Sequence, residues 1–142
     1  MFKTENNRDL AGARYHMILN HVGLTNNSKE EALRFYRDFL GFEFTREALV
    51  PNELSGQLFS VFRDVTMLVF EKTGLKIEVF VCPECRQPYP DFRHAGLLLE
   101  NFSEVMEKAP SAGVEVITGR TKEKTVNFIR DFAGNLIEIK QS

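Results

Sequence analysis

The stretch HVGL at residues 21–24 returns as HAGL at residues 94–97, and this repeat decides the fold. In each copy a helical pattern follows the histidine, and a glycine then leads into the next strand pattern, GFEF at residues 41–44 and GVEV at residues 113–116. The interval between the copies is longer than the ~20–50 residues of solenoid and propeller repeats. The sequence therefore predicts a duplicated module rather than an array of short units.

Each copy ends in a strand pattern with a glutamate at its centre, IEV at residues 77–79 and IEI at residues 137–139. Side chains alternate between the two faces of a strand, so Glu78 and Glu138 point away from the branched residues beside them. We expect the branched face to pack under helices and the glutamates to face a concave pocket. A carboxylate in the middle of a strand is costly unless it is paired or binds a metal.

Capping patterns mark one helix in each copy. Ser28, with Glu31 three residues later, forms a capping box, and Gly41 stands where a left-handed cap is expected. In the second copy Asn101 is the expected cap, and Pro110 is expected to end the helix. The apolar stripe of the first helix, which we expect to lie against the sheet, is Ala32, Phe35, Tyr36, Phe39 and Leu40.

The remaining apolar segments read as strands. We expect them at residues 17–24, 42–47, 58–63, 66–70 and 75–81 in the first copy, and at 94–100, 114–118, 125–130 and 136–140 in the second. Each half then reads β-α-β-β-β, with one additional or broken strand in the first half. The predicted fold class is α+β, with two repeated βαβββ modules that form a curved mixed sheet around a cleft.

The domain organisation follows from the same pattern. Residues 17–142 are predicted to be a single domain, with one module at residues 17–82 and the other at residues 93–142. The linker at residues 83–92 is rich in proline. Residues 1–16 show no periodicity and are expected to be a flexible extension.

Composition excludes several classes of protein. The chain has 142 residues, of which 43% are hydrophobic and 27% charged, as in ordinary globular domains. Its 18 basic and 20 acidic residues leave a net charge of −2, so we expect neither a nucleic-acid partner nor an anionic membrane surface. No apolar stretch approaches the ~20 residues of a spanning helix, and no secretory signal is visible. With only two cysteines as well, the expected location is the cytoplasm.

Two histidines and two glutamates occupy equivalent places in the repeat: His21, Glu78, His94 and Glu138. Taken singly, a strand glutamate is usually solvent-facing and a lone histidine is usually a satisfied core or surface residue. The coincidence in both halves favours a shared metal site. Imidazole and carboxylate ligands together suit Zn, Ni, Co, Mn or Fe(II) rather than a metal that prefers thiolates.

The order of these motifs resembles a known superfamily. NHVGL at residues 20–24 and ALRFYRDFLGF at residues 32–42 are similar to the opening of vicinal oxygen chelate proteins. DFAGNLIE at residues 131–138 resembles the closing motif of the family, with Phe132 where the family has proline. The resemblance covers residues 17–140. The superfamily includes glyoxalase I, methylmalonyl-CoA epimerase, fosfomycin resistance thiol transferases, extradiol dioxygenases and metal-free bleomycin-binding proteins.

The resemblance implies roles for the repeated residues. It implies that His21, Glu78, His94 and Glu138 are the metal ligands, in the order found in glyoxalase I, and that the protein is a homodimer. Thr25 and Cys82 stand where bacterial glyoxalase I has an arginine and an asparagine that contact glutathione, so glutathione dependence is not implied.

The leading functional hypothesis is a metal-dependent lyase or isomerase. The reaction would transfer a proton next to a carbonyl of a small substrate that chelates the metal through two oxygens, with Glu78 or Glu138 as the catalytic base. One alternative is a dioxygenase or thiol transferase, with Glu78 outside the coordination sphere. Another is a metal-free protein that binds a small, antibiotic-type molecule in a groove lined by Phe44, Phe59, Phe80 and Phe128.

Two further features are left without a leading role. Cys82 and Cys85 form a lone Cys-x-x-Cys, which lacks the second ligand pair of a structural zinc site and does not begin a helix. We interpret it as structurally incidental, with a redox role or an intersubunit metal site as the alternatives. His16 has no counterpart in the repeat and is interpreted as incidental.

Overall fold

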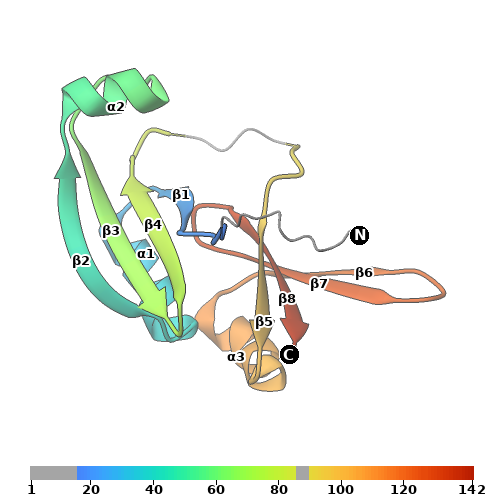
Figure 1. Ribbon diagram of the computed structural model, residues 1–142. Coiled ribbons are helices and arrows are strands. Elements are labelled where there is room, and N and C mark those ends of the chain that lie inside the picture. The colour runs from blue at the N-terminus through green and yellow to red at the C-terminus, as the bar shows by residue number, and fades with distance from the viewer. Residues whose placement is uncertain (1–15, 86–89) are drawn as a thin grey trace.

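The computed structural model describes residues 16–85 and 90–142, which fold into two four-stranded mixed sheets with helices packed on them (Figure 1). The sheet orders are β1-β4-β3-β2 and β5-β8-β7-β6. The first sheet comprises β1 (Val22–Asn26), β2 (Glu43–Val50), β3 (Val65–Lys72) and β4 (Leu75–Val81). The second comprises β5 (Ala95–Leu99), β6 (Val116–Arg120), β7 (Thr125–Arg130) and β8 (Leu136–Gln141). The α+β class and the two-module architecture are confirmed, with two sheets in place of one continuous curved sheet.

The two sheets repeat each other in strand register. In each, the first strand lies parallel to the last, β1 along β4 and β5 along β8. Gly23 pairs with Glu78, and Gly96 pairs with Glu138. The sequence repeat is therefore also a repeat in three dimensions, down to the residue that faces each glutamate across the ladder.

The helix of the first module changes type along its length. It begins as α1 (Lys29–Ala32) and continues as a π-helical segment, η2 (Leu33–Phe39). The hydroxyl of Ser28 accepts a hydrogen bond from the Glu31 N–H at 3.2 Å, as the capping box predicts. Gly41 adopts φ of +83°, the left-handed conformation expected after the helix.

Three local predictions were wrong. The segment 58–63 forms no strand: residues 58–59 end the helix α2 (Asn52–Phe59) and residues 60–63 lie outside any helix or strand, because β2 pairs with β3 directly and leaves this segment without a strand partner. Residues 17–21 lie outside any strand. Pro110 lies inside α3 (Phe102–Ala112), which ends instead at Gly113. There the Val114 N–H donates to the Ala109 carbonyl at 2.9 Å in a Schellman motif.

The hydrophobic core lies between the helices and the sheets and is shared by both modules. The branched residues beside each glutamate are buried in it, as alternation predicts. Phe35 and Phe39 are also buried there, which confirms the expected apolar stripe. The largest fully buried side chains are Tyr36, Phe35, Phe70, Leu68, Ile129, Ile137 and Ile139.

A buried polar cluster, formed by Asp131, Tyr36, Asn26 and Asn135, joins the two modules. Its centre is Asp131, whose carboxylate accepts hydrogen bonds from residues of both modules. The Asn135 amide also donates to the Thr25 carbonyl at 2.8 Å. Because Thr25 belongs to β1 and Asn135 precedes β8, this cluster aligns the strands that carry the candidate site.

No helix in the described part of the chain is long and apolar enough to cross a membrane.

Candidate metal centre

His21 and Glu78 form the first candidate pair, here called the N-terminal pair. His21 immediately precedes β1, and Glu78 is at the centre of the parallel neighbour β4. The His21 Nε2 atom lies 3.2 Å from Glu78 Oε1. The Glu78 side chain is 16% exposed and lies on the face opposite the core.

His94 and Glu138 form the equivalent C-terminal pair. His94 immediately precedes β5, and Glu138 is in the parallel neighbour β8. The His94 Nε2 atom lies 3.8 Å from Glu138 Oε1. The Glu138 carboxylate also lies 3.7 Å from the Lys140 ammonium, through its other oxygen. The Phe128 ring is 5.1 Å from the His94 ring and limits its movement on one side.

Hydrogen bonds orient both imidazoles. His94 Nδ1 lies 2.8 Å from the Phe92 carbonyl, and His21 Nδ1 lies 2.7 Å from the Asn20 side-chain oxygen. These oxygens only accept, so each Nδ1 donates its hydrogen, and Nε2 is the ring nitrogen that faces a glutamate and is available to a metal ion. Such an outer hydrogen bond is typical of histidines that bind metals.

The donor set fits a divalent cation. Two ligands of one zinc-like ion, each at ~2.0–2.2 Å, stand roughly 3.0–3.4 Å apart at ordinary coordination angles. The N-terminal pair already has this spacing, and the C-terminal pair is slightly wider.

The described part of one chain does not assemble all four residues. It contains no group of three or more histidine, cysteine, aspartate or glutamate side chains that could hold a metal. It contains two pairs, each too small to complete a zinc-like site. Convergence of His21, Glu78, His94 and Glu138 on one ion therefore remains a prediction.

An apolar pocket of about 320 Å³ lies beside β1 and β4 and is bordered by α2. The rings of Phe59 and Phe80 face it and lie 5.3 Å apart. Phe128 lies in the other module against His94. Phe44 packs on Phe70 in the core instead, because a bulge after Phe44 shifts the register of β2. The four phenylalanines thus do not line one groove within the chain.

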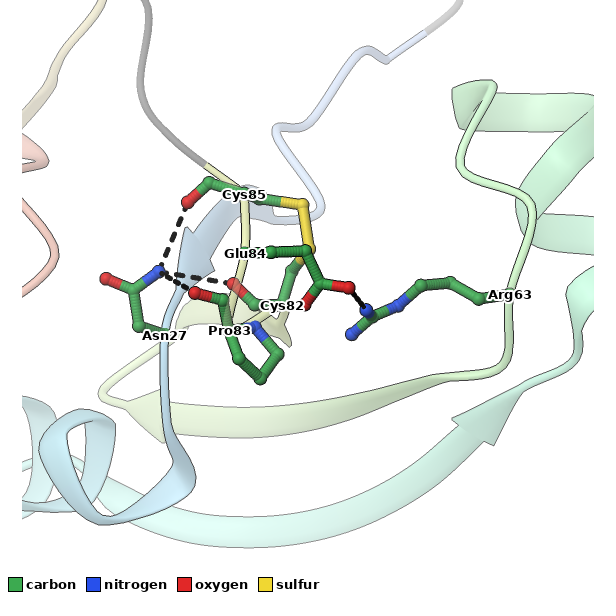
Figure 2. The surroundings of a disulfide bond; sticks show 6 residues. All are labelled: Asn27, Arg63, Cys82, Pro83, Glu84 and Cys85. Carbon is green, nitrogen blue, oxygen red and sulfur yellow. Dashed lines mark hydrogen bonds and ion pairs between the residues drawn. A yellow bond between two sulfur atoms is a disulfide. The ribbon is translucent and has the colours of Figure 1, made fainter.

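A disulfide joins Cys82 to Cys85 at the rim of this pocket (Figure 2). It was not predicted, although the Cys-x-x-Cys spacing and its place just after the Glu78 strand were visible in the sequence. His16 is exposed and lies outside any helix or strand.

Comparison with known proteins identifies the family of this chain. The family model for the Glyoxalase/Bleomycin resistance protein/Dioxygenase superfamily matches residues 18–139. A search of curated proteins gave no match.

Solved structures share the fold at low identity. A glyoxalase family protein from Enterococcus faecalis is 22% identical with a TM-score of 0.67, over 86% of this chain and 95% of that one. Glyoxalase I from Leishmania major, described as trypanothione-dependent, is 15% identical with a TM-score of 0.65, over 89% and 87%.

The fosfomycin resistance protein FosX from Listeria monocytogenes, as a mutant complexed with Mn(II) and a dihydroxypropylphosphonic acid, is 18% identical with a TM-score of 0.62, over 89% and 94%. At these identities the likeness shows the shared fold. The family model, however, spans most of the sequence, and the protein belongs to the Glyoxalase/Bleomycin resistance protein/Dioxygenase superfamily, the vicinal oxygen chelate group.

Proposed function

We propose that this protein is a cytoplasmic, homodimeric, metal-dependent lyase or isomerase that moves a proton next to a carbonyl of a small, oxygen-chelating substrate. In this proposal the N-terminal pair of one chain and the C-terminal pair of its partner share one divalent ion. Zn, Ni, Co, Mn and Fe(II) all suit the two imidazoles and two carboxylates.

The observation that carries the proposal is the matched geometry of the two His–Glu pairs. In both, a fixed Nδ1 hydrogen bond turns Nε2 toward a glutamate of the parallel strand. A purely structural salt bridge does not require this arrangement twice in equivalent register. Relatives that share the fold include glyoxalase I and a FosX complexed with Mn(II), so the fold accommodates such chemistry.

Exposed apolar side chains next to both histidines support the dimer. Large exposed hydrophobic residues lie just before Asn20 and His21, and Phe92, two residues before His94, is 97% exposed. Exposed apolar surface of this kind favours coverage by a partner. The residues before His21 are Met17, Ile18 and Leu19.

The chemistry divides between the ion and the glutamates. A bound divalent cation would supply Lewis-acid polarisation of the substrate carbonyl. Glu78 or Glu138 would accept the proton from the adjacent carbon and return it at its new position. The Phe59–Phe80 pocket, on the same side of the sheet as Glu78, would hold the apolar remainder of the substrate.

Metal analysis of the purified dimer tests the site. We expect His21→Ala and His94→Ala to lose bound metal, because each removes one nitrogen ligand. His16→Ala, which alters an exposed histidine outside both pairs, is the matched control and should keep the wild-type content. Wild-type protein that remains metal-free after incubation with Zn, Mn, Ni and Co would overturn the proposal.

Substitutions of the two glutamates distinguish between the candidate classes of reaction. For a lyase or isomerase, Glu78→Gln should retain metal and lose most of the activity on glyoxalase-type substrates, such as a hemithioacetal. Glu138→Gln should lower activity more than metal content. A dioxygenase or thiol transferase on the same ion would instead leave Glu78→Gln fully active, because Glu78 would lie outside the coordination sphere.

A metal-free binding module is the second candidate, and the pocket beside Phe59 and Phe80 is the observation that favours it. Such a module would bind an aromatic or antibiotic-type molecule without metal. Retention of such a ligand by chelator-treated protein, together with wild-type binding by His21→Ala, would favour this candidate over the enzyme.

A further inference from the structure

The position of the Cys82–Cys85 disulfide is not typical of a disulfide that stabilises a fold. It closes a loop of only two intervening residues, and so short a loop gains the least from a disulfide's restriction of the unfolded chain. In a reducing compartment, where we expect this protein, disulfides are usually catalytic or redox-active. The pair therefore needs an explanation other than stability.

Hydrogen bonds that do not involve sulfur hold the turn in place (Figure 2). The Asn27 side-chain amide donates to the carbonyls of Cys82 at 3.1 Å, Cys85 at 3.2 Å and Pro83 at 3.5 Å. The Cys82 N–H donates to the Asn26 carbonyl at 2.8 Å, and the Cys85 N–H donates to the Cys82 carbonyl at 3.2 Å. These contacts would keep the two sulfurs opposed after the S–S bond is opened.

One of the two residues between the cysteines is also anchored. Glu84 forms an ion pair with Arg63, which precedes β3 (Figure 2). The Cα atoms of Cys82 and Cys85 are 5.3 Å apart, within the range that permits a disulfide. The turn is thus built to let the bond break and re-form without rearranging its backbone.

The two cysteines differ in access. Cys82 directly follows β4 and is 3% exposed, whereas Cys85 is partly exposed. Both line the 320 Å³ pocket. An incoming group therefore meets the sulfur of Cys85 more readily than that of Cys82.

The pocket lining defines what kind of molecule can reach this sulfur. Its apolar side chains are Leu24, Phe59, Val61, Val65 and Phe80. Within the described chain no charged side chain lines it. The lining favours a small molecule with an aromatic or aliphatic body over one carrying several charges.

We propose that Cys82–Cys85 is a thiol–disulfide exchange site, at which Cys85 forms a mixed disulfide with a small apolar thiol bound in the Phe59–Phe80 pocket. The incoming thiolate attacks Sγ of Cys85, the Cys82–Cys85 bond breaks, and Cys82 leaves as a thiolate that takes up a proton. One disulfide and one thiol become another disulfide and another thiol, so no external oxidant is needed. In the reverse step the Cys82 thiolate attacks the mixed disulfide and releases the small thiol.

The wild-type protein provides the first test. The rate at which phenylmethanethiol opens the disulfide is compared with the rate for 2-mercaptoethanol, a polar thiol of similar basicity, at equal thiolate concentration and with a chelator present. We expect at least a tenfold preference for phenylmethanethiol, which disappears when the protein is unfolded in urea. Equal rates with the folded protein would overturn the proposal. The chelator makes this result independent of the proposed metal site.

Trapping variants provide the second test. Cys82→Ser removes the resolving thiol, so treatment with dibenzyl disulfide should leave one stable benzylthio adduct on Cys85, seen by intact mass and peptide mapping. The matched variant Cys85→Ser should form its adduct on Cys82 at least tenfold more slowly. Equal or faster labelling of Cys82 would contradict the assignment of Cys85. Circular dichroism confirms that each variant is folded, and if either is not, the wild-type rates decide.

Discussion

Tyr36 donates its phenolic hydroxyl to the carboxylate of Asp131 across 2.7 Å, and both residues are buried although they belong to different modules. The same Asp131 oxygen also accepts from the side-chain amides of Asn26 at 3.0 Å and Asn135 at 2.8 Å. The other oxygen accepts the backbone N–H groups of Ala133 and Asn135 at 3.0 and 2.9 Å. One carboxylate therefore satisfies five donors and ties the modules that carry the two His–Glu pairs.

Asp131→Ala is expected to destabilise the protein by about 3 kcal/mol or more, because it leaves several buried donors unpaired at once. Urea unfolding followed by circular dichroism measures the change. Asp38→Ala, which removes an exposed carboxylate paired with Arg37, is the matched control and should stay within about 0.5 kcal/mol of wild type. Similar values for the two variants would mean that the cluster does not hold the modules together.

The raised pKa of Tyr36 leads us to predict a loss of folding stability at alkaline pH. Burial, followed by the nearby Asp131 charge and hydrogen bond, raises the pKa of Tyr36 well above its ordinary 10.0. Above pH 10 the unfolded chain loses this proton while the folded chain keeps it. The contribution of Tyr36 is therefore complete below pH 10 and declines as pH rises further, by at most about 1.4 kcal/mol per pH unit.

Tyr36→Phe isolates this effect. The variant should lose about 1 kcal/mol at neutral pH with the hydrogen bond, and its stability should fall less steeply than wild type above pH 10. Tyrosinate absorbance provides a second readout, because one of the three tyrosines should ionise only as the wild-type protein unfolds. Identical alkaline slopes in both proteins would contradict the assignment.

The fold was predictable wherever local pattern and tertiary contacts agree. The repeat placed Glu78 and Glu138 on the face opposite the core, because strand alternation is a local property. Residues 58–63 are apolar enough for a strand, and only the direct pairing of β2 with β3 excludes that reading. The face of Phe44 depends on a bulge, which the sequence pattern does not reveal.

The candidate site was predictable only in part, for a related reason. The histidine and glutamate of each pair are matched by the repeat, and the structure brings them within 3.2 and 3.8 Å. The turn that carries the disulfide is held by Asn27, which directly follows the neighbouring strand β1 and is distant in sequence from the cysteines. No local pattern links that asparagine to the Cys-x-x-Cys.

Phe39→Ala is expected to lower stability by about 3–5 kcal/mol without changing the metal content per folded molecule. Phe39 is buried in the core, where it packs 5.6 Å from Phe35 and away from both His–Glu pairs. Leu49→Ala, at an exposed position of β2, is the control and should stay within about 0.5 kcal/mol of wild type. If folded Phe39→Ala protein lost its metal, the apolar stripe of the helix would belong to the metal site, and the assignment of Phe39 to the core alone would be wrong.

The last prediction tests whether two chains share each site. His21→Ala and His94→Ala chains, given different affinity tags and co-expressed, form a mixed dimer that can be purified through both tags. If the N-terminal pair of one chain meets the C-terminal pair of the other, one site combines both altered histidines and the second site is intact. The mixed dimer should then bind about half the wild-type metal and recover about half of any activity, while each variant alone recovers none. Sites formed within single chains would each lack one histidine, and the mixed dimer would bind no more metal than its parents. The same preparation carrying Asp131→Asn in one chain would show whether the polar cluster, which sets the position of β1 against β8, must be intact for the pairs to meet.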